Sequence, residues 1–375
     1  MKVLFIHNSI PEYRVPFMRE LTMLCDVEYL ITEPNLAAKI YDVHERFDIS
    51  GLSISYLRGK WQLLNIRKKI TTGKYNIVVL PPADNLFQFL CGYVAMKTAK
   101  SKKKKIVYWT EKWEKTNAKI PVIKQIKNKI QGCFIGWLAR KVDMCIAAGS
   151  CSKKYLHSLG IEDKKIRIAF DSSTSPMGQY DNIRTRYGLK LDSKLILFMG
   201  RLIARKGADL LIQAFADIVR RDDNTFLMIG GDGPALEQCL LLVESFQISK
   251  RVFFLGQVSP KERGSLYKQM DVFVLPSYMK DGTLEAWGLT VNEALEQGTP
   301  VVSTDAVGAA YDLLDGECGV MVENGNIKCL TDGLIRFVTK RKNKCLEQIC
   351  KERYSSYSVV NMANQFYETF KICVF

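Results

Sequence analysis

The sequence predicts an α/β protein of two domains, each built on a parallel β-sheet. Short apolar runs of buried-strand type alternate with amphipathic segments in both halves of the chain, and this alternation is typical of parallel sheets. At 375 residues the chain is too long for one ordinary domain, and 47% hydrophobic residues suffice for two cores. A stretch without periodicity, residues 168–183, separates the halves. We therefore expect domains at residues 1–172 and 184–357.

The first half opens with a strand-like run and a loop that leads into a helix. Five apolar runs are predicted strands: Val3–Ile6, Val27–Ile31, Ile77–Leu80, Ile106–Trp109 and Val142–Ala147. After the third run comes a long apolar segment that ends in a lysine cluster. Two prolines with Asp84 and Asn85 interrupt it, which leaves too short a run to cross a bilayer. We interpret it as a helix inside the domain.

The second half repeats the pattern at a regular pitch. Its predicted strands are residues 195–200, 226–230, 252–256 and 272–276. Helices are expected at Gly207–Arg220, after Pro234 and after Pro260. Strands joined by such helices form a parallel sheet with right-handed crossovers.

Two carboxylates flank the junction between a loop and a helix in the second half. Glu285 follows a buried strand and should lie in the loop, whereas Glu293 should lie within the helix. The helix would begin with backbone N–H groups that have no helical partner, those of Gly288, Leu289 and Thr290. Such an end attracts phosphate. A phosphate site between two carboxylates suits a nucleotide sugar, although an acidic pair on a surface helix is the simpler alternative.

The run EAWGLTVNEALEQGTPVV resembles the signature of the retaining GT-B glycosyltransferases, and most of all family 4, the group-1 glycosyltransferases. The resemblance implies two Rossmann-like domains whose parallel sheets face each other across a cleft, with the C-terminal helix 358–375 packing back on the first domain. It also implies that Glu285 contacts hydroxyls of the donor sugar and Glu293 the ribose. The amides of Gly288, Leu289 and Thr290 would contact the diphosphate.

The run GRLIARKG supplies fixed cations after a predicted strand. Departure of a nucleoside diphosphate builds negative charge, which such cations stabilise. By resemblance, Arg201 and Lys206 contact the diphosphate beside Gly200; the alternative is a pair of surface cations flanking a helix. The run GGDGP, residues 230–234, is a weaker signal of a donor-binding loop. The resemblance also implies that Gly256, Gln257 and Val258 hold the base through their backbone.

No cofactor is expected. The chain has no Asp-x-Asp sequence that would bridge a metal to a diphosphate, and its 11 cysteines and 3 histidines show no zinc-binding spacing. We therefore expect metal-independent chemistry in which the nucleotide sugar is the co-substrate. The cysteines are interpreted as reduced thiols.

Two residues of the first half, Arg14 and Glu111, are candidate contacts on the acceptor side. Many members of the family carry a glycine pair in the first loop, but this chain has Asn8, Ser9, Ile10 and Pro11 there. Arg14 is a candidate anion or acceptor contact, with a solvated surface arginine as the alternative. Glu111 should project at the edge of a strand, where many relatives have a histidine that this chain lacks.

Positive charge is concentrated in the first half. The formal net charge is +15, and Lys97–Lys141 holds fourteen Lys or Arg against two Glu, which gives 14 − 2 = +12. Within it, Pro121–Lys141 repeats apolar residues at helical spacing: Ile123, Ile126, Ile130, Phe134, Trp137 and Leu138. The helix either faces its own core or docks on an anionic membrane surface. Nucleic acid is not expected, because no recognised binding motif accompanies the lysines.

These observations predict a glycosyltransferase that moves a hexosyl group from a nucleotide sugar to a hydroxyl acceptor with retention of configuration. The acceptor would be a lipid-linked saccharide in surface polysaccharide assembly (capsule, O-antigen or exopolysaccharide). The start of the chain has no signal peptide, so the expected location is cytoplasmic, peripheral on the inner face of the membrane. Two alternatives remain, a nucleotide-sugar epimerase of GT-B fold and a non-catalytic module that binds membrane or nucleic acid.

Overall fold

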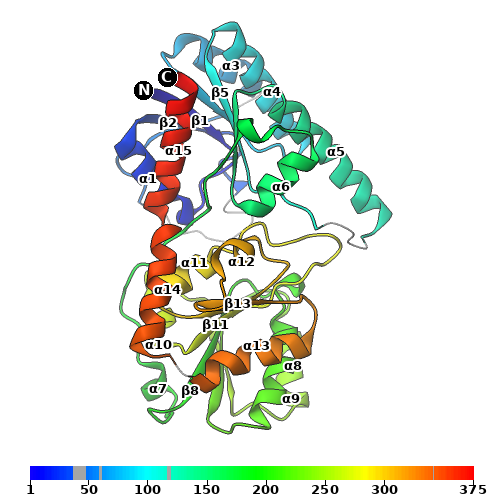
Figure 1. The fold of residues 1–375 in the computed structure, drawn as a ribbon, viewed down its shortest axis with the longest axis vertical. Coiled ribbons are helices and arrows are strands. Elements are labelled where there is room, and N and C mark those ends of the chain that lie inside the picture. The colour runs from blue at the N-terminus through cyan, green and yellow to red at the C-terminus, as the bar shows by residue number, and fades with distance from the viewer. Residues whose placement is uncertain (37–47, 59–60, 116–119, 341) are drawn as a thin grey trace. The chain divides into compact units, whose positions relative to one another are not determined.

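The computed structural model describes residues 1–36, 48–58, 61–115, 120–340 and 342–375. The chain forms two compact units (Figure 1). Unit 1 comprises Met1–Trp113, Ile120–Ser172 and Val359–Phe375, and unit 2 comprises Glu114–Lys119 and Ser173–Ser358. The segment 173–183, expected to separate the domains, belongs to unit 2, as does the short segment 114–119.

Unit 1 is built on a seven-stranded sheet in the order β3-β2-β1-β4-β5-β6-β7, with all strand pairs parallel. Its strands are β1 (Lys2–His7), β2 (Asp26–Ile31), β3 (Ser53–Tyr56), β4 (Ile77–Leu80), β5 (Lys105–Thr110), β6 (Met144–Ala147) and β7 (Ile166–Ile168). The five predicted strands are confirmed. Strands β3 and β7, at the two edges of the sheet, were not predicted; β3 has no fully buried residue and β7 is three residues long.

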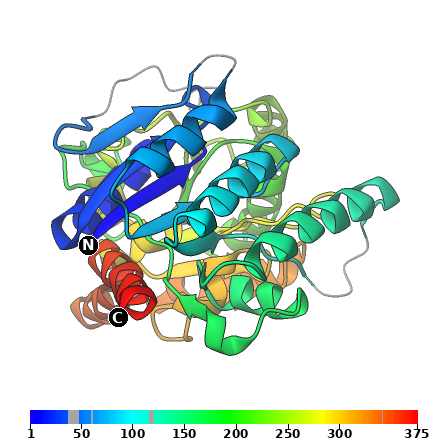
Figure 2. The same ribbon diagram turned by 90° about the horizontal axis from the view of Figure 1, so that it is seen from above.

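Helices cover both faces of this sheet (Figure 2). They are η1 (Glu12–Arg14), α1 (Val15–Leu24), α3 (Gln62–Thr72), α4 (Leu86–Ser101), α5 (Val122–Ala139), α6 (Ser150–Ser158), η2 (Asp163–Lys165) and α15 (Val359–Val374). Helices α1 and α15 pack on each other and share one hydrophobic core with the strands, whereas α3 packs on α4, and α4 on α5.

Unit 2 is built on a six-stranded sheet in the order β10-β9-β8-β11-β12-β13, again entirely parallel. Its strands are β8 (Lys194–Met199), β9 (Thr225–Gly230), β10 (Val252–Gly256), β11 (Val272–Leu275), β12 (Val301–Thr304) and β13 (Gly319–Val322). Its helices are α7 (Ile183–Arg186), η3 (Ala204–Lys206), α8 (Ala208–Val219), α9 (Leu236–Ser245), α10 (Arg263–Gln269), α11 (Thr290–Glu296), α12 (Gly308–Leu313), α13 (Ile327–Lys340) and α14 (Lys344–Ser356). The predicted parallel sheet is confirmed, and β8 pairs with β9 and β11 at its centre.

The segment between β7 and α7 has no helix or strand, as its lack of periodicity predicts, and its first half is buried whereas most of residues 176–182 are exposed. Asp171, Ser172 and Ser173 are fully buried, and Ser175 nearly so. Backbone and side-chain hydrogen bonds compensate the burial of these polar groups. For example, the amide of Asp171 donates to the carbonyl of Ala148 at 2.9 Å.

No helix among the described residues combines the length and the apolar character needed to cross a membrane.

The last helix of the chain completes the core of unit 1. Phe366 of α15 is fully buried, and its ring centroid lies 4.9 Å from that of Phe17 and 5.4 Å from that of Trp109. Because these aromatic residues come from α1, β5 and α15, the core of unit 1 needs both ends of the chain.

We expect Phe366→Ala to lower the free energy of unfolding of unit 1 by about 3–5 kcal/mol, because it removes a large buried side chain and leaves a cavity. Chemical denaturation followed by circular dichroism measures the change. Val360→Ala is the matched control on the same helix, since Val360 is half exposed, and should change stability by less than about 0.5 kcal/mol. Equal effects of the two substitutions would contradict the placement of α15 in the core.

Candidate functional site

The second unit holds a carboxylate paired with two cations. The Nζ of Lys206 lies 2.8 Å and a terminal guanidinium nitrogen of Arg205 lies 2.5 Å from Oε2 of Glu285. Only 14% of the Glu285 side chain is exposed, so this is a partly buried, charge-assisted cluster. It joins two segments that are 79 positions apart in the chain, because 285 − 206 = 79.

Sheet topology brings these segments together. Lys206 ends η3, which follows β8, and β8 pairs with β11, the strand that precedes the loop of Glu285. The turn after Lys206 fits tightly against this second loop. Gly207 has φ +74°, and a Cβ there would lie 2.1 Å from the carbonyl oxygen of Pro276. The amide of Tyr278 also donates to the carbonyl of Arg205 at 2.9 Å.

A third loop fixes the backbone of Glu285. Its amide donates to the carbonyl of Ala306 at 3.0 Å, and its carbonyl accepts from the amide of Gly308 at 3.2 Å. Gly288, three residues later, has φ +98°, and a Cβ there would lie 2.7 Å from Cγ1 of Val307. The loop after β12 therefore holds Glu285 as a rigid part of the carboxyl edge of the sheet.

The electrostatics keep Glu285 ionised. Burial by itself raises the pKa of a carboxyl group, but Lys206 and Arg205 outweigh it and hold the pKa of Glu285 below its ordinary value. An ionised carboxylate accepts hydrogen bonds and cannot donate them. Glu285 is thus suited to receive hydrogen bonds from hydroxyl groups.

Glu293 lies in different surroundings. It is in α11 and 4% exposed, and its carboxylate accepts from the hydroxyl of Tyr267 at 3.0 Å and from that of Ser173 at 3.4 Å. A terminal nitrogen of Arg263 lies 3.9 Å away. Burial raises the pKa of Glu293, and Arg263 offsets this only in part. The structure therefore joins Lys206 to Glu285, whereas Glu293 contacts a separate set of side chains.

The glycine-rich run 230–234 supports the loop of Arg201. The amide of Gly200 donates to the carbonyl of Gly230 at 3.0 Å, and that of Gly231 donates to the carbonyl of Gly256 at 2.7 Å. The ends of β8, β9 and β10 are thus joined beyond the regular sheet. Arg201 is exposed on this loop. Beyond Gly256, Gln257 is exposed and Val258 is buried, and the amides of Leu289 and Thr290 stand at the start of α11.

Unit 1 has its own polar cluster at the ends of its strands. Arg14 is only 4% exposed and lies over the ring of Trp109, 4.8 Å from its centroid. Its guanidinium pairs with both carboxylate oxygens of Asp171, one of them at 2.8 Å, and with Oε1 of Glu111 at 2.5 Å. The interpretation of Arg14 as a solvated surface arginine is therefore wrong. Its guanidinium is occupied by two carboxylates, so Glu111 is the more accessible of the two acceptor-side candidates.

Burial changes the protonation of two groups in this cluster. Desolvation raises the pKa of Glu111 to about 7, against the attraction of Arg14, although a third of the side chain is exposed. Desolvation and then Arg14 lower the pKa of His7 to about 4, so this histidine is neutral near pH 7.

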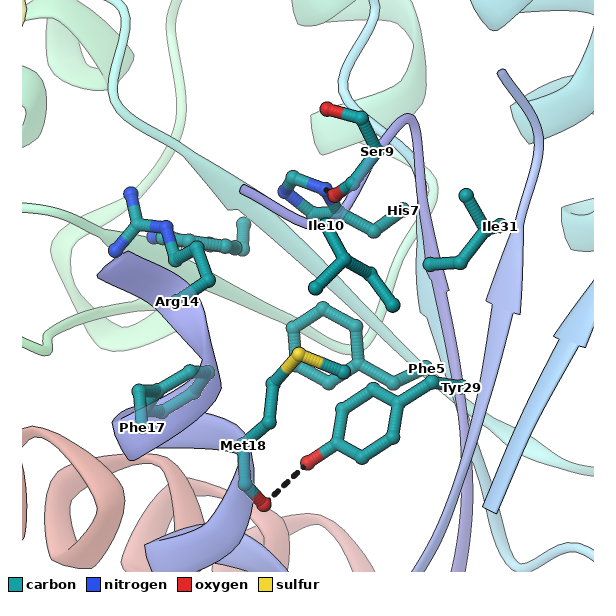
Figure 3. A pocket seen from close by; sticks show the side chains of 10 residues that line it. Phe5, His7, Ser9, Ile10, Arg14, Phe17, Met18, Tyr29 and Ile31 are labelled. Carbon is teal, nitrogen blue, oxygen red and sulfur yellow. Dashed lines mark hydrogen bonds between the residues drawn. The ribbon is translucent and has the colours of Figure 1, made fainter. Parts of the chain in front are cut away.

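A small cavity lies beneath the first loop of unit 1 (Figure 3). Its walls combine Ser9 and Ile10 of the loop with core side chains such as Phe5 and Met18. At about 20 Å³ it has room for about one water molecule and none for a sugar ring. The cavity is therefore a packing gap below the loop, and it is not an acceptor site.

The two halves of the basic helix α5 differ in how far they are covered by the rest of unit 1. Toward its C-terminus, Phe134 stacks on Phe89 of α4 with centroids 4.4 Å apart, and Leu138 is buried. Toward its N-terminus, Ile123, Ile126 and Ile130 are half exposed or more. Figure 1 shows this end projecting away from the rest of unit 1. Residues 116–119, within the basic segment 97–141, lie outside the described residues.

Three charged residues of these clusters were missed in the sequence analysis. Arg205 adjoins Lys206 in the same run of letters and could have been included on that ground. Asp171 and Arg263 lie in segments with no motif, and only their tertiary partners reveal them.

Part of unit 2 is similar in sequence to known glycosyltransferases. Residues 179–353, which lie within unit 2, match the family model described as glycosyl transferases group 1. The D-inositol 3-phosphate glycosyltransferase of Corynebacterium diphtheriae is 37% identical over 142 residues, which cover 36% of this chain and 32% of that protein. A GDP-mannose-dependent alpha-(1-6)-phosphatidylinositol monomannoside mannosyltransferase of Mycolicibacterium smegmatis is 32% identical over 151 residues, covering 40% and 39%. The chain thus spans less than half the length of either relative.

The likeness in three dimensions extends over the entire chain. The crystal structure of Anabaena HepE in complex with UDP and glucose matches 99% of this chain and 100% of that one, with a TM-score of 0.72 and 16% identity. At that identity the match shows the fold. It confirms the predicted GT-B class, with two Rossmann-like domains of parallel sheet.

We expect Glu111→Gln to remove part of the pH dependence of stability. Because the pKa of Glu111 is raised from 4.5 in a model peptide to about 7 in the folded protein, its contribution is present below pH 4.5 and is lost as the pH rises to about 7. Relative to wild type, the variant should thus gain on the order of 1 kcal/mol between pH 4.5 and 8, after allowance for its partial exposure. Urea unfolding across this range measures the difference, and a difference that stays constant with pH would contradict the assignment.

Proposed function

We propose that the protein is a retaining glycosyltransferase that moves a hexosyl group from a nucleotide sugar to a hydroxyl acceptor. The observation that carries this proposal is the cluster of Glu285, Lys206 and Arg205 at the carboxyl ends of two neighbouring parallel strands, the usual place of a ligand in such sheets. The cluster lies within the region that matches the group 1 model. The names of the relatives, and the UDP and glucose bound to Anabaena HepE, also support transfer of a sugar from a nucleotide sugar.

In this proposal Glu285 accepts hydrogen bonds from hydroxyls of the donor sugar. Two cations and one carboxylate give the cluster a net charge of 2 − 1 = +1, so it still attracts a diphosphate. Lys206, with Arg201 of the same segment after β8, then stabilises the charge that builds on the leaving group. Glu293 contacts the ribose, and backbone groups hold the rest of the donor: Gly200, Gly256, Gln257, Val258, Gly288, Leu289 and Thr290.

The proposed chemistry is front-face substitution. The bond from the sugar to the diphosphate oxygen breaks while the acceptor hydroxyl attacks from the same side, and the departing phosphate takes the hydroxyl proton. Configuration at the sugar carbon is retained. We propose that fixed cations alone neutralise the leaving group, so that transfer needs no metal ion.

We expect Glu285→Gln and Lys206→Ala each to lower the rate of nucleotide release from the donor at least about a hundredfold, because each removes a group that meets the reacting sugar or the leaving group. The assay incubates the protein with a panel of nucleotide sugars and measures released nucleotide. Glu237→Gln and Lys250→Ala are matched controls at exposed positions of the same unit, and both should keep the wild-type rate. A wild-type rate of nucleotide release in a folded Glu285→Gln variant would contradict the assignment of the site.

Product analysis separates transfer from epimerisation in the same assay. A transferase joins the sugar to an added acceptor, whereas an epimerase converts the donor without one. A binding module without activity would release no nucleotide from any donor.

We propose a lipid-linked saccharide as the acceptor, presented at the inner face of the membrane during assembly of a surface polysaccharide. Support comes from the exposed apolar side chains of two helices of unit 1 that pack on each other, α4 and α5, together termed the apolar patch: Leu86, Leu90, Tyr93, Val122, Ile123, Ile126 and Ile130. Exposed lysines such as Lys127 and Lys129 flank it. Apolar side chains enter the headgroup region while lysines attract anionic lipid, so such a patch suits a peripheral membrane enzyme. The protein would then work from the cytoplasm.

We expect Ile123→Asp combined with Ile126→Asp to reduce binding to vesicles of mixed anionic and neutral phospholipid about tenfold or more, because it replaces the most exposed part of the patch with charges that anionic lipid repels. Co-sedimentation with the vesicles measures bound protein. Leu240→Asp combined with Leu241→Asp, on the exposed side of α9 in unit 2, introduces the same charges elsewhere and should leave binding unchanged. Equal losses in both variants would mean that net charge, and not the patch, governs binding.

A further inference from the structure

Arg263 has donor capacity that the described residues do not use. It is the first residue of α10 and about one third exposed. Its Nε is buried and has no hydrogen-bond partner within the described part of the chain. A buried guanidinium N–H is normally paired, so this one calls for a partner.

The carboxylate of Glu293, near Arg263, does not accept a hydrogen bond from this guanidinium. A terminal nitrogen of Arg263 lies 3.9 Å from Oε1 of Glu293, too far for a hydrogen bond. Glu293 already accepts from Tyr267 at 3.0 Å and from Ser173 at 3.4 Å. By contrast, Lys206 and Arg205 approach Glu285 within 2.8 Å. The pair of Arg263 and Glu293 therefore offers free donors beside a carboxylate held in place by other groups.

The position of Arg263 relates this pair to the donor. Arg263 and Tyr267 are four residues apart on α10, hence on one face of the helix, and both reach Glu293 on α11. The loop between β10 and α10 begins at Gly256, Gln257 and Val258, the residues proposed to hold the base. Arg263 stands at the other end of this loop, where a terminal nitrogen of its side chain lies 3.9 Å from the proposed ribose carboxylate.

We propose that Arg263 is a nucleoside-binding residue that donates from its guanidinium to a carbonyl oxygen of the donor's base, next to the ribose held by Glu293. This inference rests on the proposed function of the unit 2 site. A guanidinium has only N–H donors, so it pairs with acceptors. Uracil and guanine present carbonyl oxygens at their edges, whereas adenine presents an amino donor in the corresponding position. Arg263 therefore selects a donor with a keto base, UDP- or GDP-linked, over an ADP-linked one.

The test compares the binding of UDP, GDP and ADP by isothermal titration calorimetry to wild type and to Arg263→Met, which keeps the apolar length of the side chain and removes its donors. Wild type should bind UDP or GDP at least tenfold more tightly than ADP. In Arg263→Met the affinity for the preferred nucleotide should fall ten- to a hundredfold and that for ADP less than threefold. Arg263→Lys, which keeps the charge but loses the planar fork, should also lose most of the preference.

Lys261→Ala is the matched control, because it removes one positive charge from an exposed position in the same loop. It should change neither the affinities nor the preference, and thermal unfolding of each variant checks that it is folded. A wild type that binds ADP as tightly as UDP and GDP overturns the inference, as does an unchanged preference in Arg263→Met and Arg263→Lys. A wild type that binds none of the three nucleotides overturns the proposed function itself.

Discussion

The buried carboxylate of Glu285 imposes the main constraint on unit 2. A carboxylate taken out of water is unstable unless cations and hydrogen bonds replace its hydration. Here Lys206 and Arg205 supply the cations, and they come from the loop after β8, whereas Glu285 follows β11. Because β8 and β11 are parallel neighbours, their carboxyl ends meet at one edge of the sheet, and the two loops can approach closely. The tight contacts of Gly207 and Gly288 follow from the same approach.

Two glutamates eight positions apart in the chain consequently have opposite electrostatics. Cations hold the pKa of Glu285 below its ordinary value, while burial holds that of Glu293 above it. Glu285 is therefore a charged acceptor paired with two cationic side chains, and Glu293 is a carboxylate held within a hydrogen-bond network.

Unit 1 buries its charges in a different way. Asp171 and Glu111 both pair with Arg14 at the ends of the strands. Arg14 is thereby shielded from solvent, and the carboxyl of Glu111 stays partly exposed. The positive charge of the unit is instead carried by lysines at its surface, next to apolar side chains of α4 and α5 that no other described element covers. Unit 1 therefore combines a polar edge with a basic surface that carries exposed apolar side chains.

The alternation of apolar runs determined the fold class, because a strand buried on both faces of a parallel sheet must be apolar throughout. The motif around Glu285 and Glu293 predicted the candidate site residues of unit 2. Edge strands such as β3 were not predicted, because half-exposed strands lack a continuous apolar run. The burial of Asp171 was not predicted either, because it lies in a segment without periodicity. Only the tertiary structure decided which charges pair. The pairs of Arg205 with Glu285 and of Arg14 with Asp171 span 80 and 157 positions, and only the order of strands in the sheet brings such distant residues together.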